Sequence, residues 1–451
     1  MIRITTDGLR AAIGVVAVLC LTAATLSAQT EQLFHLTRRS PQVVWTNPAM
    51  FSPYKTSLGS SSYGSIASNS FSLADFADRV PGEGYTISAS NVVDDLNGNQ
   101  YLTVDEHFGL LLNIAREKYQ WGLSFRAVQS NFALVPEETV LLLANGNGQF
   151  IGESVNIAPD FAISYYNEFA AHGAYKIGNL SLGARARLII GGVNSSTERN
   201  TIELFTNPEY YQLEFTTDYS INTTGLVTYD PATGNFGISD SPFEDFINNN
   251  NGFAFDLGAT YEVGKLFLAA SATNIGSIRW DGGRSQTFET QGTFVYEGLA
   301  FDEFEDEESF GELVDSLGGI LEFQTSDANY VTALPSRYYG SARYDINDKW
   351  STGFLLYGEQ RRGQFIPGAT LAVNRHFGET FTLGTSLGLR NGSYGNVGLN
   401  VDVKLWILHG FLVTDNILGL VNPTGFSTAN IRFGANLVFG RVDNDATGGE
   451  L

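Results

Sequence analysis

Residues 119–127, Tyr-Gln-Trp-Gly-Leu-Ser-Phe-Arg-Ala, decide the fold class of this chain. Apolar side chains occupy every second position, and polar or small side chains occupy the positions between them. Because side chains on a β-strand alternate between its two faces, one face of this strand suits lipid and the other suits water. The pattern indicates a strand in the wall of a transmembrane β-barrel.

The same alternation recurs along the chain, most clearly in residues 180–188, 253–262, 381–390 and 397–405. The connections between these stretches alternate between short turns and long loops, as in barrels with periplasmic turns and outer loops. We therefore predict an all-β fold, a transmembrane antiparallel β-barrel of about 14 strands. The first strand is predicted near Tyr85–Asn91 and the last at Ala429–Phe439, and the even count places both termini in the periplasm.

Composition supports the barrel and limits its partners. Aromatic residues make up 13% of the chain and charged residues 16%, against about 25% charged residues in an average domain. A surface that faces lipid needs few charges. The net charge of -22 argues against nucleic acid as a partner and against adsorption to anionic lipid through basic patches.

The N-terminus reads as a cleaved secretory signal over residues 1–28. Two basic residues, Arg3 and Arg10, precede an apolar run from Ala11 to Ala24. This run is shorter than the ~20 residues that span a bilayer. A buried N-terminal helix is the alternative. Cys20, the single cysteine, lies within this signal, so the mature chain is expected to lack disulfides and thiolate metal sites.

We expect three further parts: an N-terminal plug over residues 29–81, the barrel over 82–440 and a polar periplasmic tail over 441–451. Residues 29–81 are rich in serine, glycine and aromatics but weakly periodic, and the lumen of such a barrel must be filled or left open to water. A disordered periplasmic leader is the alternative to a plug.

The long loops contain three candidate short helices, over residues 136–145, 241–247 and 307–317, with capping or helical-spacing signals. Eight carboxylates lie between Asp302 and Asp315. We interpret this loop as a solvated face, and a patch that bridges divalent cations or lipopolysaccharide is the alternative.

No motif in the sequence indicates an enzyme or a cofactor site. The five histidines are scattered, and neither a nucleophile elbow nor a phosphate loop is present. Oxygen-bearing side chains at Asp95, Asn97, Asn99 and Glu106 resemble a calcium-binding loop, although Gln100 occupies the position that needs glycine. An ordinary hairpin rich in asparagine and glycine explains the same residues, and we predict no metal.

Basic residues occupy the face opposite the lipid-like one on several predicted strands. An arginine on the lipid face would cost ~2–4 kcal/mol near the bilayer midplane, so this inward placement is first a folding requirement. Lumen carboxylates such as Asp256, Glu262 and Asp402, or acids of the plug, are the expected partners. An unpaired subset could instead bind the carboxylate of an amphiphile. The candidate lumen-lining residues are Arg126, Arg185, Arg187, Arg343, Arg390, Lys404 and Arg432.

Several short stretches carry a family resemblance. Trp45 to Ala49, followed by Met50 to Pro53, resembles the N-terminal "NPA" hatch region of FadL-like and PorV-like outer-membrane barrels. Further stretches resemble an uncharacterised Bacteroidota-type family within that superfamily, a domain of unknown function. These stretches are Gly146, Asn147, Phe150, Gly152; Leu182, Gly183, Arg185, Arg187; and Ile431, Arg432, Gly434, Asn436, Phe439, Gly440.

The resemblance implies that Asn47, Pro48 and Ala49 belong to a plug. FadL-like barrels import hydrophobic molecules, which makes passive transport of hydrophobic or amphiphilic small molecules across the cell outer membrane the leading hypothesis. PorV-like barrels serve secretion, so an accessory or scaffold for secretion or surface attachment is the second. A soluble β-rich periplasmic protein is the third. The expected partners are outer-membrane lipid, lipopolysaccharide, the barrel-assembly machinery and a hydrophobic ligand.

Overall fold

The computed structural model describes residues 32–442 apart from 70–76, 81–83, 88–95, 97, 226, 231–234, 239–249, 282–284, 297–322, 391–392 and 423–425. The expected signal over residues 1–28 therefore lies outside the described residues. So does nearly all of the expected C-terminal tail. None of the helices in the described ranges is both long and apolar enough to cross a membrane.

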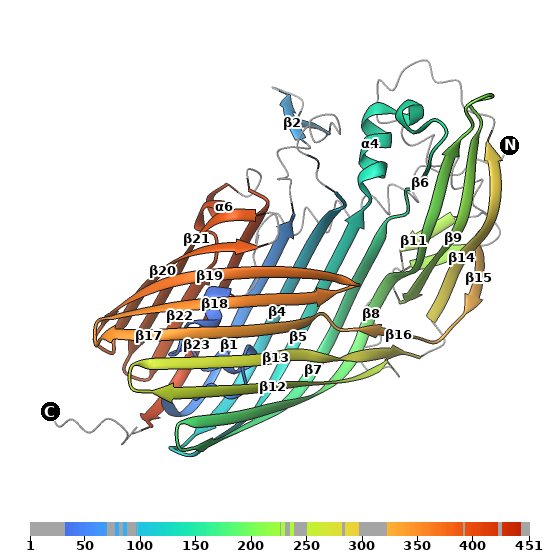
Figure 1. The fold of residues 1–451 in the computed structure, drawn as a ribbon. Helices are drawn as coiled ribbons and strands as arrows, with labels where there is room; N and C mark the ends of the chain where they lie inside the picture. Colours follow the sequence, from blue (N-terminus) through green and yellow to red (C-terminus); the bar gives the residue numbers. More distant parts are fainter. Residues whose placement is uncertain are drawn as a thin grey trace.

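Within these ranges, fourteen antiparallel strands form a closed ring, which confirms the predicted fold (Figure 1). The ring closes because β1 pairs with both β4 and β23. Its order is β1 (Tyr54–Ser68), β4 (Gln100–Ala115), β5 (Tyr119–Val135), β7 (Asp160–Ile177), β8 (Leu180–Thr206), β12 (Asn251–Val263), β13 (Leu266–Trp280), β17 (Ser336–Asn347), β18 (Trp350–Arg361), β19 (Gln364–Phe377), β20 (Phe381–Arg390), β21 (Ser393–Leu405), β22 (Leu408–Thr414) and β23 (Thr428–Arg441).

Short connections gather at one end of the ring, which we call the short-turn end. Turns of two or three residues join β4 to β5, β7 to β8 and β21 to β22 there, and Tyr54 at the start of β1 pairs with Arg441 at the end of β23. The chain therefore enters the ring at the start of β1 and leaves it at the end of β23 on this same end. Most connections at the opposite end are long, as the sequence predicted.

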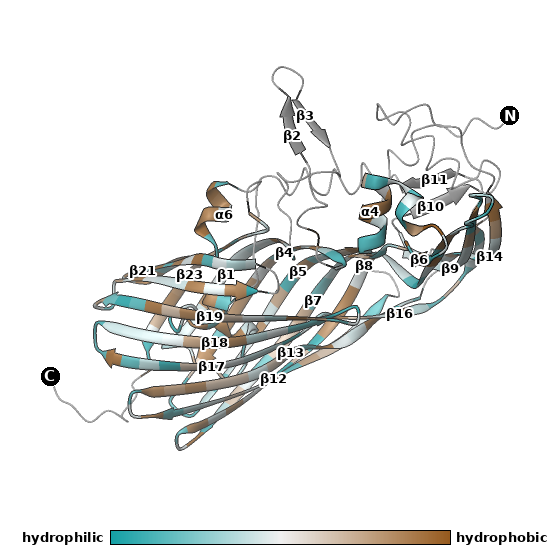
Figure 2. Cartoon of the chain, turned by 45° about the horizontal axis from the view of Figure 1, so that its top comes forward, coloured by the Kyte–Doolittle hydropathy of each residue, from teal (hydrophilic) through white to brown (hydrophobic). Residues whose placement is uncertain are grey.

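The wall turns its large apolar side chains outward. On β5, Tyr119, Trp121 and Leu123 are about half exposed, whereas Gln120 and Arg126 are buried. Hydrophobic segments recur along β12, β13 and β18 in Figure 2. An outward apolar face with inward polar residues is the arrangement that a lipid-embedded barrel requires.

The predicted start of the barrel was wrong. β1 covers Tyr54–Ser68, inside the segment that we assigned to the plug. Among the described residues, β3 (Gly84–Ile87) pairs with β2 (Ala77–Val80) alone, in a separate two-stranded sheet. Serines and glycines occupy most positions of β1, so its apolar alternation is too weak to read. The count of fourteen is right although its first member is a different strand.

Residues 32–53 lie inside the ring, and we call them the luminal segment. It contains the short helix α2 (Gln32–His35) and the 3-10 turn η2 (Pro41–Trp45), and every residue of both is buried. Leu33 and Phe34 pack with Leu355 of β18 and Phe411 of β22. A carboxylate of Asp415 accepts from the backbone N–H of Leu33 at 2.6 Å. The segment therefore contacts several strands of the wall.

The outer part of β8 carries a sheet that rises beyond the rest of the ring (Figure 1). Here β8 pairs with β6 (Ser154–Asn156) and β9 (Leu213–Thr224), and β9 pairs with β14 (Ser285–Tyr296), which pairs with β15 (Gln324–Asp327). β16 (Tyr330–Ala333) pairs with β13, and β10 (Val227–Asp230) pairs with β11 (Asn235–Ile238). Apolar residues between α4 (Glu137–Asn145), η4 (Asn147–Phe150) and this sheet form a separate core.

One of the three predicted loop helices is confirmed. α4 begins after Pro136 and ends before Gly146, where the capping signals placed it. The other two candidates, over residues 241–247 and 307–317, lie outside the described residues, as does the acidic stretch from Asp302 to Asp315. The structure adds α6 (Ile417–Val421), a five-residue helix that was not predicted from the sequence.

Candidate functional site

Three predicted lumen arginines meet in one buried cluster on β5 and β8. We call Arg126, Glu168, Arg185, Arg187 and Asp256 the Glu168 cluster. Arg187 contacts Glu168 and Asp256 at 2.9 Å each, and Arg185 contacts them at 2.7 and 3.3 Å. Arg126 also pairs with Glu168. Asp256 was an expected partner, whereas Glu168 was not among the predicted residues.

The luminal segment rests directly on this cluster. The guanidinium of Arg126 lies 5.5 Å from the ring centre of Trp45. Asn47 donates from Nδ2 to the backbone oxygen of Ala270 at 3.1 Å and accepts at Oδ1 from the N–H of Ala49 at 2.9 Å. The stretch Asn47, Pro48 and Ala49 is thus folded against the inner wall.

Two glycines of the wall make room for that stretch. A Cβ atom at Gly183 of β8 would lie 2.4 Å from the backbone carbon of Pro48, and one at Gly258 of β12 would lie 2.0 Å from Oδ1 of Asn47. Real Cβ contacts are never that short, so any larger residue would displace the segment. We call these two positions the glycine seat.

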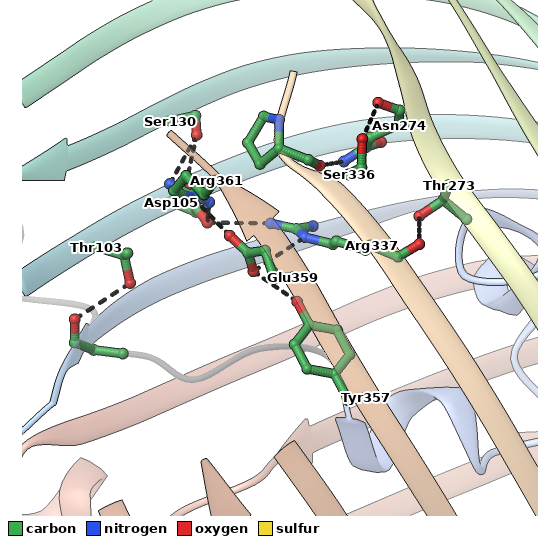
Figure 3. A network of polar contacts seen from close by, with 12 residues as sticks. Thr103, Asp105, Ser130, Thr273, Asn274, Ser336, Arg337, Tyr357, Glu359 and Arg361 are labelled. Carbon is green, nitrogen blue, oxygen red and sulfur yellow. Dashed lines mark hydrogen bonds and ion pairs between the residues drawn. The ribbon is translucent and has the colours of Figure 1, made fainter. Parts of the chain in front are cut away.

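A second buried cluster crosses the lumen (Figure 3). We call Asp105, Arg337, Glu359, Arg361 and Arg390 the Glu359 cluster. Arg361 of β18 contacts Asp105 of β4 at 2.6 Å and Glu359 at 2.5 Å, and Arg337 of β17 contacts Asp105 at 3.1 Å. Tyr357 donates to Glu359 at 2.6 Å, and Ser130 donates to Asp105 at 2.7 Å.

Asp105 and Arg361 come from opposite walls. In the ring of described strands, six strands separate β4 from β18 in either direction. Walls that are joined by a direct ion pair lie closer together than the opposite walls of a round fourteen-stranded barrel would, because barrel diameter grows with strand number. The barrel is therefore narrowed at the level of the Glu359 cluster.

The turn between β18 and β19 also reaches across the lumen, where it contacts β7 and β8. Its first residue, Arg362, has a positive φ of 47°, which is uncommon for a residue other than glycine. Its guanidinium contacts Asp160 at the start of β7 at 2.6 Å and also donates to the backbone oxygen of Thr197 in β8. We call the contact between Arg362 and Asp160 the latch.

A family model described as "Family of unknown function (DUF5723)" matches residues 48–415. The chain belongs to this family. No curated relative matches the sequence.

Solved structures similar to this chain include a FadL homologue and two toluene transporters, all at low identity. A FadL homologue of Pseudomonas aeruginosa is 13% identical, with 90% of this chain and 95% of that chain covered and a TM-score of 0.41. The toluene transporter TbuX of Ralstonia pickettii is 9% identical, with 89% and 94% covered and a TM-score of 0.44. The toluene transporter TodX of P. putida is 10% identical, with 92% and 96% covered and a TM-score of 0.41. At these values the likeness assigns no substrate.

The other predicted lumen residues, apart from Arg390 of the Glu359 cluster, are dispersed along the barrel. Arg432 is buried, with its guanidinium 4.7 Å from the ring centre of Phe34, and Arg343 pairs with Asp345 at 2.6 Å. Lys404 lies near the short-turn end, with its ammonium 5.9 Å from the ring centre of Tyr54. Arg390 is buried, and its nearest carboxylate, Glu359, is 3.7 Å away.

The expectation that acids of the plug pair with these arginines was wrong for the luminal segment. Residues 32–53 contain no acidic residue, and Arg38 and Arg39 of that segment instead approach Glu262 at 3.5 Å and Asp402 at 3.9 Å. Two of the three lumen carboxylates that we expected to pair with wall arginines, Glu262 and Asp402, therefore face the segment.

The calcium-loop alternative does not fit the described part of this stretch. Asp95 and Asn97 lie outside the described residues, but Glu106 lies within β4, paired with Gly64 and Gln129. Because the chain is extended from Gln100 onward, it cannot wrap around an ion as a compact loop does. Among the described residues, no group of three or more acidic, histidine or cysteine side chains could hold a metal ion.

His35 of the luminal segment is buried in a neutral setting. Its ring stacks on Tyr339 at 4.7 Å between ring centres, and its nitrogens lie 3.0 Å from Oγ1 of Thr46 and 3.1 Å from Oγ of Ser341. Burial lowers the pKa of His35 to about 3. At neutral pH, the imidazole that holds the segment against the wall is therefore uncharged.

Proposed function

We propose that this chain is an outer-membrane barrel that lets hydrophobic or amphiphilic small molecules cross passively, and that the described conformation is its closed state. The observation that carries the proposal is the closure of the lumen by the β18–β19 hairpin. Ion pairs at Arg361 and Arg362 hold this hairpin to the opposite wall, and they are separate from the strand pairing that closes the ring. The lumen can therefore open while the wall stays intact.

The membrane position follows from β8. This strand has 27 residues, about 90 Å at ~3.3 Å per residue, whereas a transmembrane strand needs ~9–11. On β8 the strongly exposed large apolar residues are Leu182 and Leu188, both near the short-turn end. We place the membrane around this part of the strand, with the short-turn end in the periplasm and the outer sheet at the cell surface.

The lumen also offers a partner for an anionic head group. The Nε and Nη1 atoms of Arg390 have no hydrogen-bond partner within the described part of the chain. Arg390 pairs in register with Gly368, two residues from Ile366, which belongs to an apolar cluster with Tyr101 and Phe132. A guanidinium beside apolar side chains suits an amphiphile with a carboxylate.

The outer sheet supports the second candidate, a scaffold for secretion or surface attachment. About half of β8 projects past the part that we place in the membrane. Its pairing with β9, which in turn pairs with β14, creates a wall that transport does not require. A barrel that never opens and only presents this sheet would fulfil that role.

A latch variant distinguishes the two functions. We expect Asp160→Asn combined with Arg362→Gln to increase the uptake of the hydrophobic fluorophore N-phenyl-1-naphthylamine several-fold in cells that produce the barrel. Arg199→Gln is the matched control, because Arg199 pairs with Asp218 and Glu289 on the exposed outer sheet and not across the lumen. Uptake at the wild-type rate in a folded latch variant would favour the scaffold.

A further inference from the structure

All six lysines of the chain lie at one end of the barrel. They begin β1, end β7 and β21, or lie in the turns between β4 and β5, β12 and β13, and β17 and β18, which are all at the short-turn end. The residues are Lys55, Lys118, Lys176, Lys265, Lys349 and Lys404. A chain with a net charge of -22 has thus gathered its lysines at a single rim.

Arginines and lysines are used differently in this barrel. Arginines form the buried clusters of the lumen, where their planar groups bind two carboxylates at once. Lysine carries a compact, strongly hydrated charge on a flexible stem, which suits a lipid–water interface. At the rim, Glu262, Asp345 and Glu379 are engaged by arginines of the same end.

A groove of about 330 Å³ opens at this rim between the start of β1, the β19–β20 turn, the β21–β22 turn and the end of β23. Arg39, Lys404 and Arg441 line it together with one acidic residue, Glu379. The groove is therefore locally basic.

Lys404 is the cation of the groove that is available to a ligand. Arg39 donates to the backbone oxygens of Gly378 at 2.7 Å and Glu379 at 3.2 Å, and Arg441 pairs with the carboxylate of Glu379. Within the described residues, Lys404 has no ion pair, and its ammonium lies above the ring of Tyr54. A bound anion would meet this ammonium first.

Apolar side chains flank the groove on the lipid side. Trp406 is 85% exposed and Phe439 is 45% exposed, and both line the groove. Trp406 has a positive φ of 55°, a conformation that is strained for a bulky residue. This turn therefore holds an indole outward at the level where aromatic belts meet lipid head groups.

We propose that this groove binds the phosphodiester head group of an anionic phospholipid from the periplasmic leaflet. The ammonium of Lys404 contacts the phosphate, and the first part of an acyl chain lies against Trp406 and Phe439. The inference rests on the membrane position given under the proposed function. Because Arg39 belongs to the luminal segment, the lipid also lies beside the point where that segment reaches the rim.

Native mass spectrometry of the full-length barrel in detergent tests the site. We expect phosphatidylglycerol to be retained at least five-fold more than phosphatidylcholine, and soluble glycerol phosphate not to be retained. Lys404→Gln should lower the retention of phosphatidylglycerol several-fold. Lys349→Gln removes the same charge from the β17–β18 turn, which does not line the groove, and should leave the retention unchanged.

Equal retention of the two lipids would overturn the proposal, as would an equal loss in the Lys404 and Lys349 variants, since that would indicate a general charge effect. Retention of glycerol phosphate alone would indicate a site for free phosphate esters and would also overturn it. Neither lysine belongs to the latch, so lipid binding that persists while the latch variant fails to change uptake would refute the gate and not this site.

Discussion

Glu168 pairs with more buried arginines than Asp256, the other carboxylate of the Glu168 cluster. It contacts Arg126, Arg185 and Arg187 and is fully buried, and Asp256 is the other carboxylate of its cluster. Removing one member of a buried ionic network costs about 3–5 kcal/mol, because the remaining charges lose their compensation. We expect Glu168→Gln to lower the free energy of unfolding by about that amount, measured as the urea midpoint of heat-modifiable gel mobility.

Glu289→Gln is the control for this variant. Glu289 also pairs with an arginine, but its side chain is 41% exposed, and exposed pairs contribute about 0–1 kcal/mol. If the two variants shift the midpoint equally, the Glu168 cluster does not hold the barrel together in the way that its geometry indicates.

We expect His35 to make the stability of the packed luminal segment dependent on pH. Burial lowers its pKa from 6.5 to about 3, so the folded state excludes a proton that the released segment binds. The stability that His35 contributes is complete above pH 6.5 and is lost as the pH falls from 6.5 toward 3, at ~1.4 kcal/mol per pH unit.

Hydrogen exchange of residues 33–47, corrected for intrinsic rates, measures this effect. We expect exchange to accelerate between pH 6 and pH 4 in the wild type, and His35→Gln, which stays neutral, to remove that dependence. A pH dependence that survives in His35→Gln would assign the effect to another group.

Among the elements, the luminal segment packs against the wall at the two positions of the glycine seat. A side chain at Gly183 would overlap the backbone of Pro48, so Gly183→Val should leave the ring paired but displace the segment. We expect trypsin to cleave after Arg38 or Arg39 in the folded variant much faster than in the wild type. Gly340→Val is the control, because a Cβ there meets nothing within 4 Å, and equal cleavage in both variants would contradict the seat.

The alternation of apolar and polar residues was sufficient to predict most of the elements, since β5, β8, β12, β20 and β21 each show a clean lipid face. It failed at β1, where serines and glycines replace the apolar residues. It also missed Arg361, because Leu355, Leu356 and Tyr357 of β18 are apolar on both faces. Arg337 could have been found, since it has the same parity as Arg343 on β17.

At the scale of the whole molecule, the partners across the lumen could not be predicted. Asp105 and Arg361 are 256 positions apart and meet because the closed ring places β4 opposite β18. A local pattern shows which face a side chain occupies but not which side chain stands on the opposite wall. The ion pair between β4 and β18 is therefore a property of the closed barrel that only its three-dimensional structure reveals.

We infer that the β18–β19 hairpin closes a passage, and cross-linking the latch should hold this hairpin shut. Cys20 is the single cysteine of the chain and lies in the predicted signal, so thiols at Asp160→Cys and Arg362→Cys can be joined selectively with a short bis-maleimide. The measurement is the uptake of N-phenyl-1-naphthylamine by cells that produce this double variant. We predict rapid uptake before cross-linking and a return to the rate of cells that lack the barrel afterwards. The same uptake before and after complete cross-linking would show that the hairpin is not a gate.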